Sequence, residues 1–178
     1  SSMFDFRAHS SGHSDKGWFD NKPVTPNAYR DNCFLTQRLV NHVGFISTVI
    51  ENHDESRGVN SYIPAEDLND TSKKFIATML MMQRGLPFIY QGQEIGMENV
   101  IFHDISEVDD ISTLDEYKIA LENGYSKEEA LKIVNRYSRD NARTPMQWSS
   151  EKEAGFTTGK PWLPLNPNYT RINVESQE

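Results

Sequence analysis

Three short apolar segments, separated by two longer stretches with helical periodicity, constrain the fold of this chain more than any other feature. The segments are Met3–Phe6, Phe45–Ile50 and Pro87–Tyr90, and each is continuous rather than alternating. Unbroken apolar runs of this length are typical of strands that are buried on both faces, as in a parallel sheet. We therefore predict an α/β fold in which parallel strands alternate with helices.

The stretches between these segments predict two helices. The first runs from about Ala28 to Val43, and the second begins near Thr71 or Ser72, either of which can cap it. Gly85 suits the C′ position of the second helix, and Pro87 prevents its continuation. The apolar residues at helical spacing are Phe34, Leu35, Leu39 and Val43 in the first helix and Phe75, Ile76, Met79, Leu80 and Met82 in the second.

The pattern changes after the third strand. Thr113 with Glu116, and Ser126 with Glu129, both have the spacing of a capping box, which marks a helix start. Together they predict an αα-hairpin from about Leu114 to Arg136, inserted after the last strand. The final 35 or so residues are rich in Pro, Gly, Asn and Trp, and they predict irregular structure.

The spacing of the strands indicates that the chain is part of a larger domain. The predicted strands recur about every 42 residues, so an eight-unit barrel at this spacing needs roughly 340 residues, a usual size for such barrels. This chain of 178 residues supplies about three units. We expect residues 1–178 to be a partial barrel domain that is incomplete at both ends. The missing part of the barrel is then its expected partner, and apolar faces left uncovered favour self-association.

Charge and cysteine content exclude several classes of protein. The net charge of −8 and the pI of about 5.1 argue against a nucleic-acid partner and against a basic membrane-binding surface. The single cysteine, Cys33, rules out an internal disulfide and a zinc site built from cysteines. The apolar runs are too short to span a membrane, and no signal segment is recognised at the start, so we expect a cytoplasmic location.

Polar side chains follow each predicted strand. The three segments are Arg7–His9, Glu51–Arg57 and Gln91–Glu94. Right-handed crossovers place the carboxyl ends of parallel strands on one face, where β/α folds have their active sites. Each segment is dense in hydrogen-bonding groups, which a ligand with many hydroxyl groups requires. We therefore predict a sugar-binding site on this face.

The sequence Asn52-His53-Asp54 is the most informative of these segments. A carboxylate beside an imidazole can bind hydroxyls, act as acid or base, or contribute to a metal site. Alternatively, His53 and Asp54 cap the next turn and pair with Arg57, a purely structural arrangement that we consider equally plausible. A metal site needs further ligands, and the remaining histidines show no ligand spacing, so we expect no metal. Those histidines include His9, His13 and His103.

Three further polar segments are candidates for ligand binding or for purely structural roles. Glu94 lies in a loop with Gly92 and Gly96, where it either binds a ligand or pairs with an arginine. The segment Arg139–Trp148 holds two arginines, two amides and a tryptophan, which suit the rim of a carbohydrate site or an incidental surface loop. The acidic run Glu107–Asp110 is most simply a solvated face.

Taken in order, these motifs resemble those of the α-amylase family of glycoside hydrolases, family 13. The resemblance is to its oligo-1,6-glucosidase, α-glucosidase and sucrose-isomerase branch, and it extends from about Met3 to the C-terminus. The motifs that carry it are Glu51-Asn52-His53-Asp54 with Arg57, then Pro87–Met97, Arg139–Trp148, Ala154–Thr157 and Asn166–Tyr169.

The resemblance implies a fold and roles for individual residues. The chain is similar to about strands six to eight of a (β/α)8 (TIM) barrel. Asp54 matches the family's aspartate that holds sugar hydroxyls in the cleavage subsite, and His53 matches the histidine before it. Either Arg139 or Arg143 is expected to line the floor of the glucose pocket. Substrate binding is expected also of Asn52, Arg57 and Glu94.

The resemblance also implies what this chain alone lacks. In the family, retention uses an aspartate nucleophile and a glutamate acid/base, which belong to strands upstream of Ser1. We therefore expect the full-length protein to be a retaining α-glucosidase and this chain alone to be inactive. No cofactor is expected, and a structural calcium, where present, belongs to an early loop of the family. The alternatives are a sucrose isomerase, a trehalose-6-phosphate hydrolase, and a non-catalytic barrel that binds a partner.

Overall fold

The computed structural model describes residues 2–178 and contains one small parallel sheet. Its strands are β1 (Ser2–Phe4), β2 (Phe45–Thr48) and β3 (Leu86–Pro87), in the order β1-β2-β3. Met3 lies opposite Ile46 in the parallel register of the first pair. The predicted parallel arrangement is confirmed, although each strand is shorter than its apolar run.

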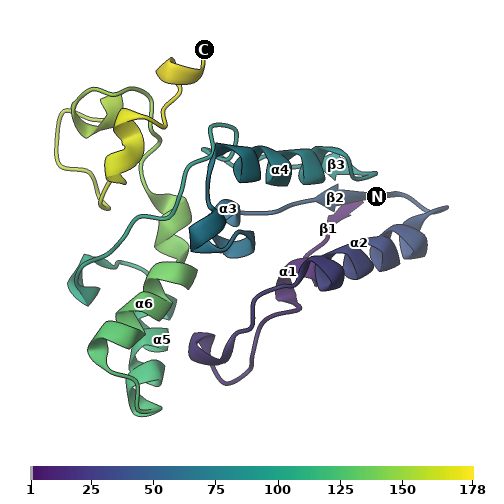
Figure 1. The fold of residues 1–178 in the computed structure, drawn as a ribbon, viewed down its shortest axis with the longest axis horizontal. Coiled ribbons are helices and arrows are strands. Elements are labelled where there is room, and N and C mark those ends of the chain that lie inside the picture. Colours follow the sequence, from purple (N-terminus) through teal and green to yellow (C-terminus); the bar gives the residue numbers. More distant parts are fainter. Residues whose placement is uncertain (1) are drawn as a thin grey trace.

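Helices connect the strands in two crossovers. Between β1 and β2 lie α1 (Arg7–Ser10) and α2 (Pro26–Val40), and between β2 and β3 lie α3 (Gly58–Tyr62) and α4 (Asp70–Met81). In the view of Figure 1 the short strands lie between α2 and α4. This half of the chain, residues 2–97, is called the β/α part below.

The starts of the two long helices are set by local hydrogen bonds. Thr25 caps α2 through its side chain, with a proline at the first helical position. The predicted cap of α4 was misplaced, because Asn69 is the N-cap and Ser72 completes a capping box three residues later. Gly85 is not at the C′ position of α4; a side chain there would collide with the backbone carbonyl of Ile46. It allows the chain to approach β2 closely.

The core of the β/α part is small and lies between α3 and α4. It consists of Ile50, Val59, Ile63, Ile76 and Leu80, all less than 9% exposed. Each such buried side chain contributes roughly 1.5–3 kcal/mol.

The expectation that the strands are buried on both faces holds for Ile46–Thr48 of β2 but was wrong for β1 and β3. Met3 is 73% exposed, and Phe45 and Ile89 are each more than half exposed. In α2 the predicted apolar face is also uncovered, with Leu39 63% and Val43 81% exposed. The apolar pattern is present as predicted, but within residues 2–178 only part of it, such as Ile46, Ile76 and Leu80, is covered.

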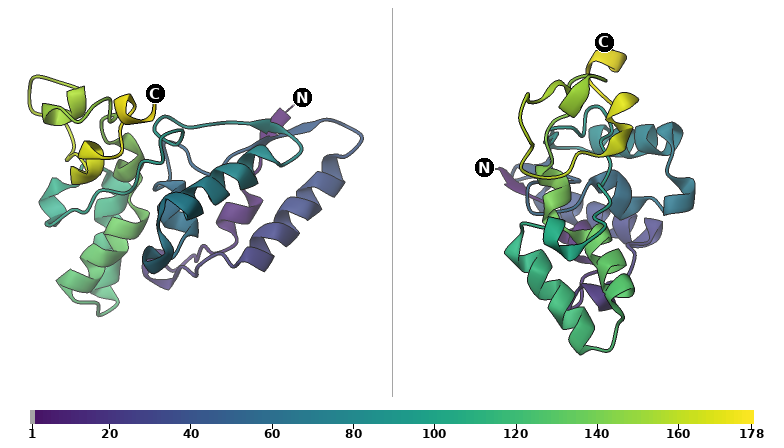
Figure 2. Two further views of the ribbon diagram at one scale, coloured as in Figure 1. Left: turned by 45° about the horizontal axis from the view of Figure 1, so that its top comes forward. Right: turned by 90° about the vertical axis from the view of Figure 1, so that its left-hand side faces the viewer.

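The remaining residues, 98–178, form a second unit that we call the helical part. Helices α5 (Ile111–Glu122) and α6 (Lys127–Tyr137) follow β3 and pack against each other. Their core contains Val100, Phe102, Val108 and Val134, the last completely buried. Figures 1 and 2 show α5, α6 and the C-terminal segment on one side of the β/α part.

The starts of α5 and α6 differ in how well the sequence predicted them. Ser126 and Glu129 form the expected capping box of α6. The box predicted at Thr113 was wrong, because Asp110 caps α5 and accepts the Thr113 N–H at 2.9 Å. Glu116 instead accepts the backbone N–H of Trp18 at 2.7 Å, which ties the loop after α1 to α5.

Short 3-10 helices complete the chain. The C-terminal 35 residues are largely irregular, as predicted. No helix among residues 2–178 is long and apolar enough to cross a membrane. The 3-10 helices are η1 (Trp18–Asp20), η2 (Ala65–Asp67), η3 (Ile105–Glu107), η4 (Arg139–Arg143), η5 (Lys152–Gly155), η6 (Pro167–Thr170) and η7 (Glu175–Gln177).

Candidate active site

Asp54 occupies the loop that leaves the carboxyl end of β2, where the sequence predicted it. The amide oxygen of Asn52 accepts the Asp54 N–H at 2.7 Å, which closes a tight Asx turn. Within this turn the Nε2 atom of His53 lies 3.2 Å from an Asp54 carboxylate oxygen. The side chains of Asp54 and His53 are 51% and 72% exposed. The turn therefore presents a carboxylate and an imidazole together at the surface.

Two arginines from the helical part reach this carboxylate. Arg139 and Arg143 stand at the two ends of η4, and both guanidinium groups lie against Asp54. Their nitrogens lie 3.4 Å and 3.2 Å from the Oδ1 atom of Asp54. Arg143 also donates to the backbone carbonyl of His53 at 2.9 Å. Both arginines thus contact the Asn52–Asp54 turn.

A second carboxylate, which the sequence analysis missed, holds the other side of both arginines. Asp110 is buried and accepts hydrogen bonds from Arg139 at 2.7 Å and from Arg143 at 3.1 Å. The expectation that the run Glu107–Asp110 is a solvated face was therefore wrong at Asp110. The sequence feature that could have indicated a structural role for Asp110 was its position just before α5, since aspartate is a favoured N-cap residue.

The environment of Asp110 keeps it ionised. Burial by itself raises the pKa of this carboxyl, but the hydrogen bonds from Arg139 and from both donors of Thr113 outweigh burial and hold the pKa below its ordinary value. The same hydrogen bond raises the pKa of Arg139. Asp140, also buried, accepts the backbone N–H groups of Asp109 and Asp110, which fixes the chain at this point.

Arg57 lies beneath the site rather than on it. Its guanidinium is 1% exposed and pairs with the buried carboxylate of Glu51 at 3.2 Å. It also donates to the carbonyl oxygens of Gln91 at 2.6 Å and Asn141 at 3.2 Å. Burial raises the pKa of Glu51, while Arg57 and the N–H of Gly58 act in the opposite direction. Arg57 therefore joins the loops after β2 and β3 to η4.

Glu94, the remaining predicted site residue, is not brought to Asp54. Its side chain is exposed, in the turn after β3, and it lines a separate hollow against α4. That hollow also contains Lys73 and Arg171. The structure thus assembles Asn52, His53, Asp54, Arg139 and Arg143 at one place and leaves Arg57 below and Glu94 apart.

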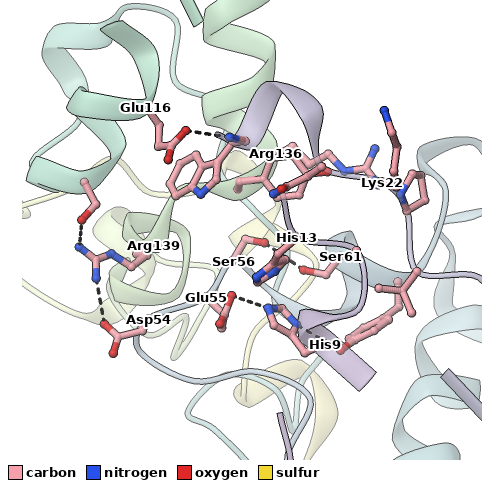
Figure 3. A pocket seen from close by; sticks show the side chains of 18 residues that line it. His9, His13, Lys22, Asp54, Glu55, Ser56, Ser61, Glu116, Arg136 and Arg139 are labelled. Atoms are coloured by element: carbon pink, nitrogen blue, oxygen red, sulfur yellow. Dashed lines mark hydrogen bonds and ion pairs between the residues drawn. The ribbon is translucent and has the colours of Figure 1, made fainter. Parts of the chain in front are cut away.

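Two cavities meet at Asp54 and differ in character. One, of about 330 Å³, is mainly aromatic and includes Phe4, Phe88 and Tyr90. The rings of Phe4 and Phe88 pack edge to face with centroids 4.8 Å apart. The other, of about 340 Å³, is polar and extends from Asp54 and Arg139 toward the loop after α1 (Figure 3). An apolar wall beside fixed charges can accommodate both the faces and the hydroxyls of a sugar ring.

The polar cavity also gathers potential metal ligands, which the spacing of histidines in the sequence did not reveal. His9, His13 and Glu55 each offer a ligand atom, and these atoms lie within 4.8 Å of one another. His13 follows His9 by four residues, but Glu55 comes from the loop after β2, so sequence spacing could not have shown the group. Two effects lower the pKa of His13: burial, which is the larger, and the neighbouring imidazole of His9.

Parallel strands with a polar, charge-rich site beyond their carboxyl ends define a segment of a β/α enzyme domain. The sequence model of the α-amylase catalytic domain family matches residues 1–178. The chain belongs to this family, and the family resemblance read from the sequence is confirmed.

Individual relatives agree with this assignment. The chain is 41% identical over 174 residues to an oligo-1,6-glucosidase of Bacillus cereus, covering 97% of this chain and 31% of that protein. It is 42% identical over 125 residues to a trehalose-6-phosphate hydrolase of Bacillus subtilis, covering 70% and 22%. An isomaltulose synthase structure from Klebsiella sp. LX3 superposes with a TM-score of 0.88 at 34% identity, over 98% of this chain and 32% of that one. The chain thus spans about a third of the oligo-1,6-glucosidase and of the isomaltulose synthase.

Proposed function

We propose that the full-length protein is a retaining α-glucosidase that hydrolyses short α-glucosides, such as isomalto- and malto-oligosaccharides. The observation that carries this proposal is the Asp54 carboxylate, held between His53 and two arginines beyond the end of β2. Membership of the α-amylase catalytic domain family and the similarity to an oligo-1,6-glucosidase support the choice of reaction and substrate.

The proposal assigns this chain to one portion of the barrel. We place β1, β2 and β3 as strands six, seven and eight of a (β/α)8 barrel, with α5 and α6 as an insertion after the last strand. A retaining mechanism needs two carboxyls about 5–5.5 Å apart across the glycosidic bond. In this proposal the remainder of the domain supplies that nucleophile and acid/base, and residues 1–178 supply groups that bind the sugar.

Asp54 and His53 are proposed to bind hydroxyls of the glucosyl ring at the cleavage subsite. Their hydrogen bonds become stronger as the ring distorts toward an oxocarbenium ion, so their contribution is larger in the transition state than in the ground state. Arg139 and Arg143 hold the Asp54 carboxylate in place. Asn52 fixes the backbone of the turn through its hydrogen bond to the Asp54 N–H.

Arg57 and Glu94 have more distant roles in this proposal. The buried Arg57 is a positioning residue, since its guanidinium connects Glu51, the Gln91 carbonyl and η4 rather than facing the cavities. Glu94 is exposed and is proposed to contact only the outer part of a longer substrate.

Two similar proteins support alternatives to this proposal. An isomaltulose synthase and a trehalose-6-phosphate hydrolase are both similar to this chain, so a sucrose isomerase or a trehalose-6-phosphate hydrolase with the same glucosyl-binding groups is the alternative. A non-catalytic barrel that binds a partner is less well supported, because such a barrel has no need of an exposed carboxylate held by His53 and two arginines.

The test is the substitution Asp54→Asn in the full-length protein. Loss of a charge that binds mainly the transition state is expected to lower kcat by at least about 100-fold with a much smaller change in KM. Asp31→Asn, on the exposed face of α2, is the matched control and is expected to leave both constants unchanged. Unchanged kcat in the Asp54 variant would remove this carboxylate from the mechanism.

The same preparation decides between the reaction classes. Isomaltose, maltose, sucrose and trehalose 6-phosphate are each supplied, and the products are identified by chromatography. Release of glucose from isomaltose or maltose supports the proposal. Isomaltulose or trehalulose formed from sucrose, or cleavage confined to trehalose 6-phosphate, would assign the protein to one of the alternatives, and no turnover of any substrate would support the non-catalytic barrel.

A further inference from the structure

The polar cavity beside Asp54 contains two imidazoles and a carboxylate that the proposed reaction does not use. His9 lies in α1, His13 in the turn that follows, and Glu55 in the loop after β2. Figure 3 shows the three side chains directed toward one another within the cavity. Two neutral imidazoles and one carboxylate are a ligand set that Zn²⁺ and similar divalent transition ions prefer.

The ring of His9 is oriented by a neighbouring group on each of its nitrogens. Its Nδ1 atom lies 3.2 Å from the Tyr62 hydroxyl, so one side of the ring has a hydrogen-bonding partner. Its Nε2 atom is buried and lies 2.6 Å from a Glu55 carboxylate oxygen. The two groups form a close ion pair, although its geometry is not that of a regular hydrogen bond.

A metal ion would take the place of the direct contact between His9 and Glu55. The present 2.6 Å between Nε2 and the Glu55 oxygen is the distance of an ion pair, whereas two ligands of a tetrahedral zinc ion, each about 2.0–2.1 Å from the metal, lie about 3.3 Å apart. Zinc binding therefore requires the Glu55 carboxylate to move slightly away from the ring. The hydrogen bond between the opposite ring nitrogen and the Tyr62 hydroxyl orients the imidazole, as the partner of the second nitrogen does in metal-binding histidines.

The loop that carries His13 is fixed by backbone hydrogen bonds. Lys22 donates its N–H to the carbonyl of Gly12 at 2.8 Å, and Ser14 donates to the amide of Asn21 at 2.8 Å. No side chain fits at Gly12, because its Cβ atom would overlap the Lys22 carbonyl. The position of His13 next to His9, with ring centroids 4.8 Å apart, is thus set by the loop.

The accessibility of the cluster differs between its members. His9 and Glu55 are largely buried, with side chains 14% and 26% exposed, whereas His13 is exposed at the mouth of the cavity. The three ligand atoms lie within 4.8 Å of one another, and binding to one ion requires the side chains of His13 and Glu55 to rotate. The open side leaves room for water as a fourth ligand, as in exchangeable rather than closed structural sites.

We propose that His9, His13 and Glu55 bind one divalent transition-metal ion, with Zn²⁺ as the chemically matched ion. The spacing of the histidines in sequence predicted no metal, but the third ligand comes from a different crossover of the sheet. The proposal is independent of the reaction assigned above, since it concerns binding alone.

The test is a titration of the full-length protein with Zn²⁺ in competition with a chromophoric chelator. Because a general loss of folding would also abolish binding, the far-ultraviolet circular dichroism of each variant is compared with that of the unmodified protein. Replacing a second-shell group already costs 10–100-fold in affinity, so His13→Ala and Glu55→Gln are each expected to weaken binding by more than about tenfold. His42→Ala, an exposed histidine near the end of α2, is the control and is expected to leave the affinity unchanged.

Cobalt gives a second, spectroscopic readout. Co²⁺ bound through two imidazoles is expected to show visible absorption bands in the unmodified protein and in His42→Ala, and to lose them in His13→Ala. Equal Zn²⁺ affinity in the unmodified protein and in His13→Ala would overturn the proposal, as would the absence of binding at equimolar Zn²⁺. Displacement of the zinc by Mg²⁺ or Ca²⁺ at similar concentration would also contradict it, because those ions prefer oxygen ligands.

Discussion

The two halves of the chain are stabilised in different ways. Among the described residues, fourteen of the eighteen large apolar side chains that are exposed lie in the β/α part, including Val43 and Met82 at about 80%. The helical part exposes four, and its buried interior includes hydrogen-bonded polar groups such as Asp110, Thr113 and Asn141. The helical part thus leaves fewer large apolar side chains exposed, whereas the β/α part presents surfaces suited to further packing.

The difference predicts how the isolated chain behaves in solution. Contiguous apolar surface much above a few hundred Å² favours association, so we expect a native mass spectrum of this chain alone to show species heavier than 20.4 kDa. Replacing Val43 and Met82 by lysine is expected to reduce the association, while Ile101→Lys in the helical part is not. A monomer of the unmodified chain that unfolds cooperatively would contradict the comparison.

Breaking the connection between the two halves is expected to have the largest effect on stability. Arg57→Met leaves the buried Glu51 carboxylate unpaired and removes hydrogen bonds to Gln91 and Asn141, which together cost about 5 kcal/mol of unfolding free energy. Urea unfolding of the full-length protein measures this loss. The double variant Glu51→Leu, Arg57→Met is expected to recover part of it, because no buried charge remains. Equal stability of the single and double variants would show that the pair is not coupled.

One substitution made in each half sharpens the comparison. Phe102→Ala removes a ring that is 1% exposed in the core of the helical part and is expected to cost about 4 kcal/mol. Phe75→Ala, at a position 63% exposed on α4, is expected to change the stability of the isolated chain by no more than about 0.5 kcal/mol. In the full-length protein the loss of stability caused by Phe75→Ala is expected to be larger if other strands and helices cover α4. Equal losses of stability in the Phe102→Ala and Phe75→Ala variants of the isolated chain would contradict the difference between the two halves.

The smallest expected effect is the contribution of Asp110 to the pH dependence of folding stability. Its pKa in the folded chain lies below that in the unfolded chain, which is about 3.9. The carboxylate therefore stabilises the fold above about pH 4, and this contribution is lost as the pH falls through the lowered pKa. Urea unfolding of the unmodified protein and of Asp110→Asn, at pH values from 7 to 3, is expected to show a difference that narrows toward pH 3. A constant difference would exclude this role.

Features determined by neighbouring residues were predictable from the sequence. The alternation of strands and helices follows from local periodicity, and the capping box of α6 joins Ser126 to Glu129 within one turn. The cap of α4 was predicted two to three residues too late, because Asn69, Thr71 and Ser72 all have suitable side chains and only the backbone decides among them.

Features determined by distant partners were not predictable in this way. The position of Asp54 after β2 could be inferred from the strand order, but its arginine partners lie 85 and 89 residues away in sequence. Asp110 was taken for part of a solvated acidic run because its burial depends on Arg139 and Arg143 folding over it. Similarly, the interior position of Arg57 depends on the Asn141 carbonyl, 84 residues further along.

The ion pairs of Asp110 with two arginines have a consequence for any ligand that binds at Asp54. A free arginine side chain carries about 2 kcal/mol of rotamer entropy, which is lost when a ligand immobilises it. Here Arg139 and Arg143 are already immobilised from below by Asp110, before their outer nitrogens meet anything that arrives at Asp54. A sugar that binds to this carboxylate therefore does not have to order the arginines that support it, and more of its contact energy remains available as affinity.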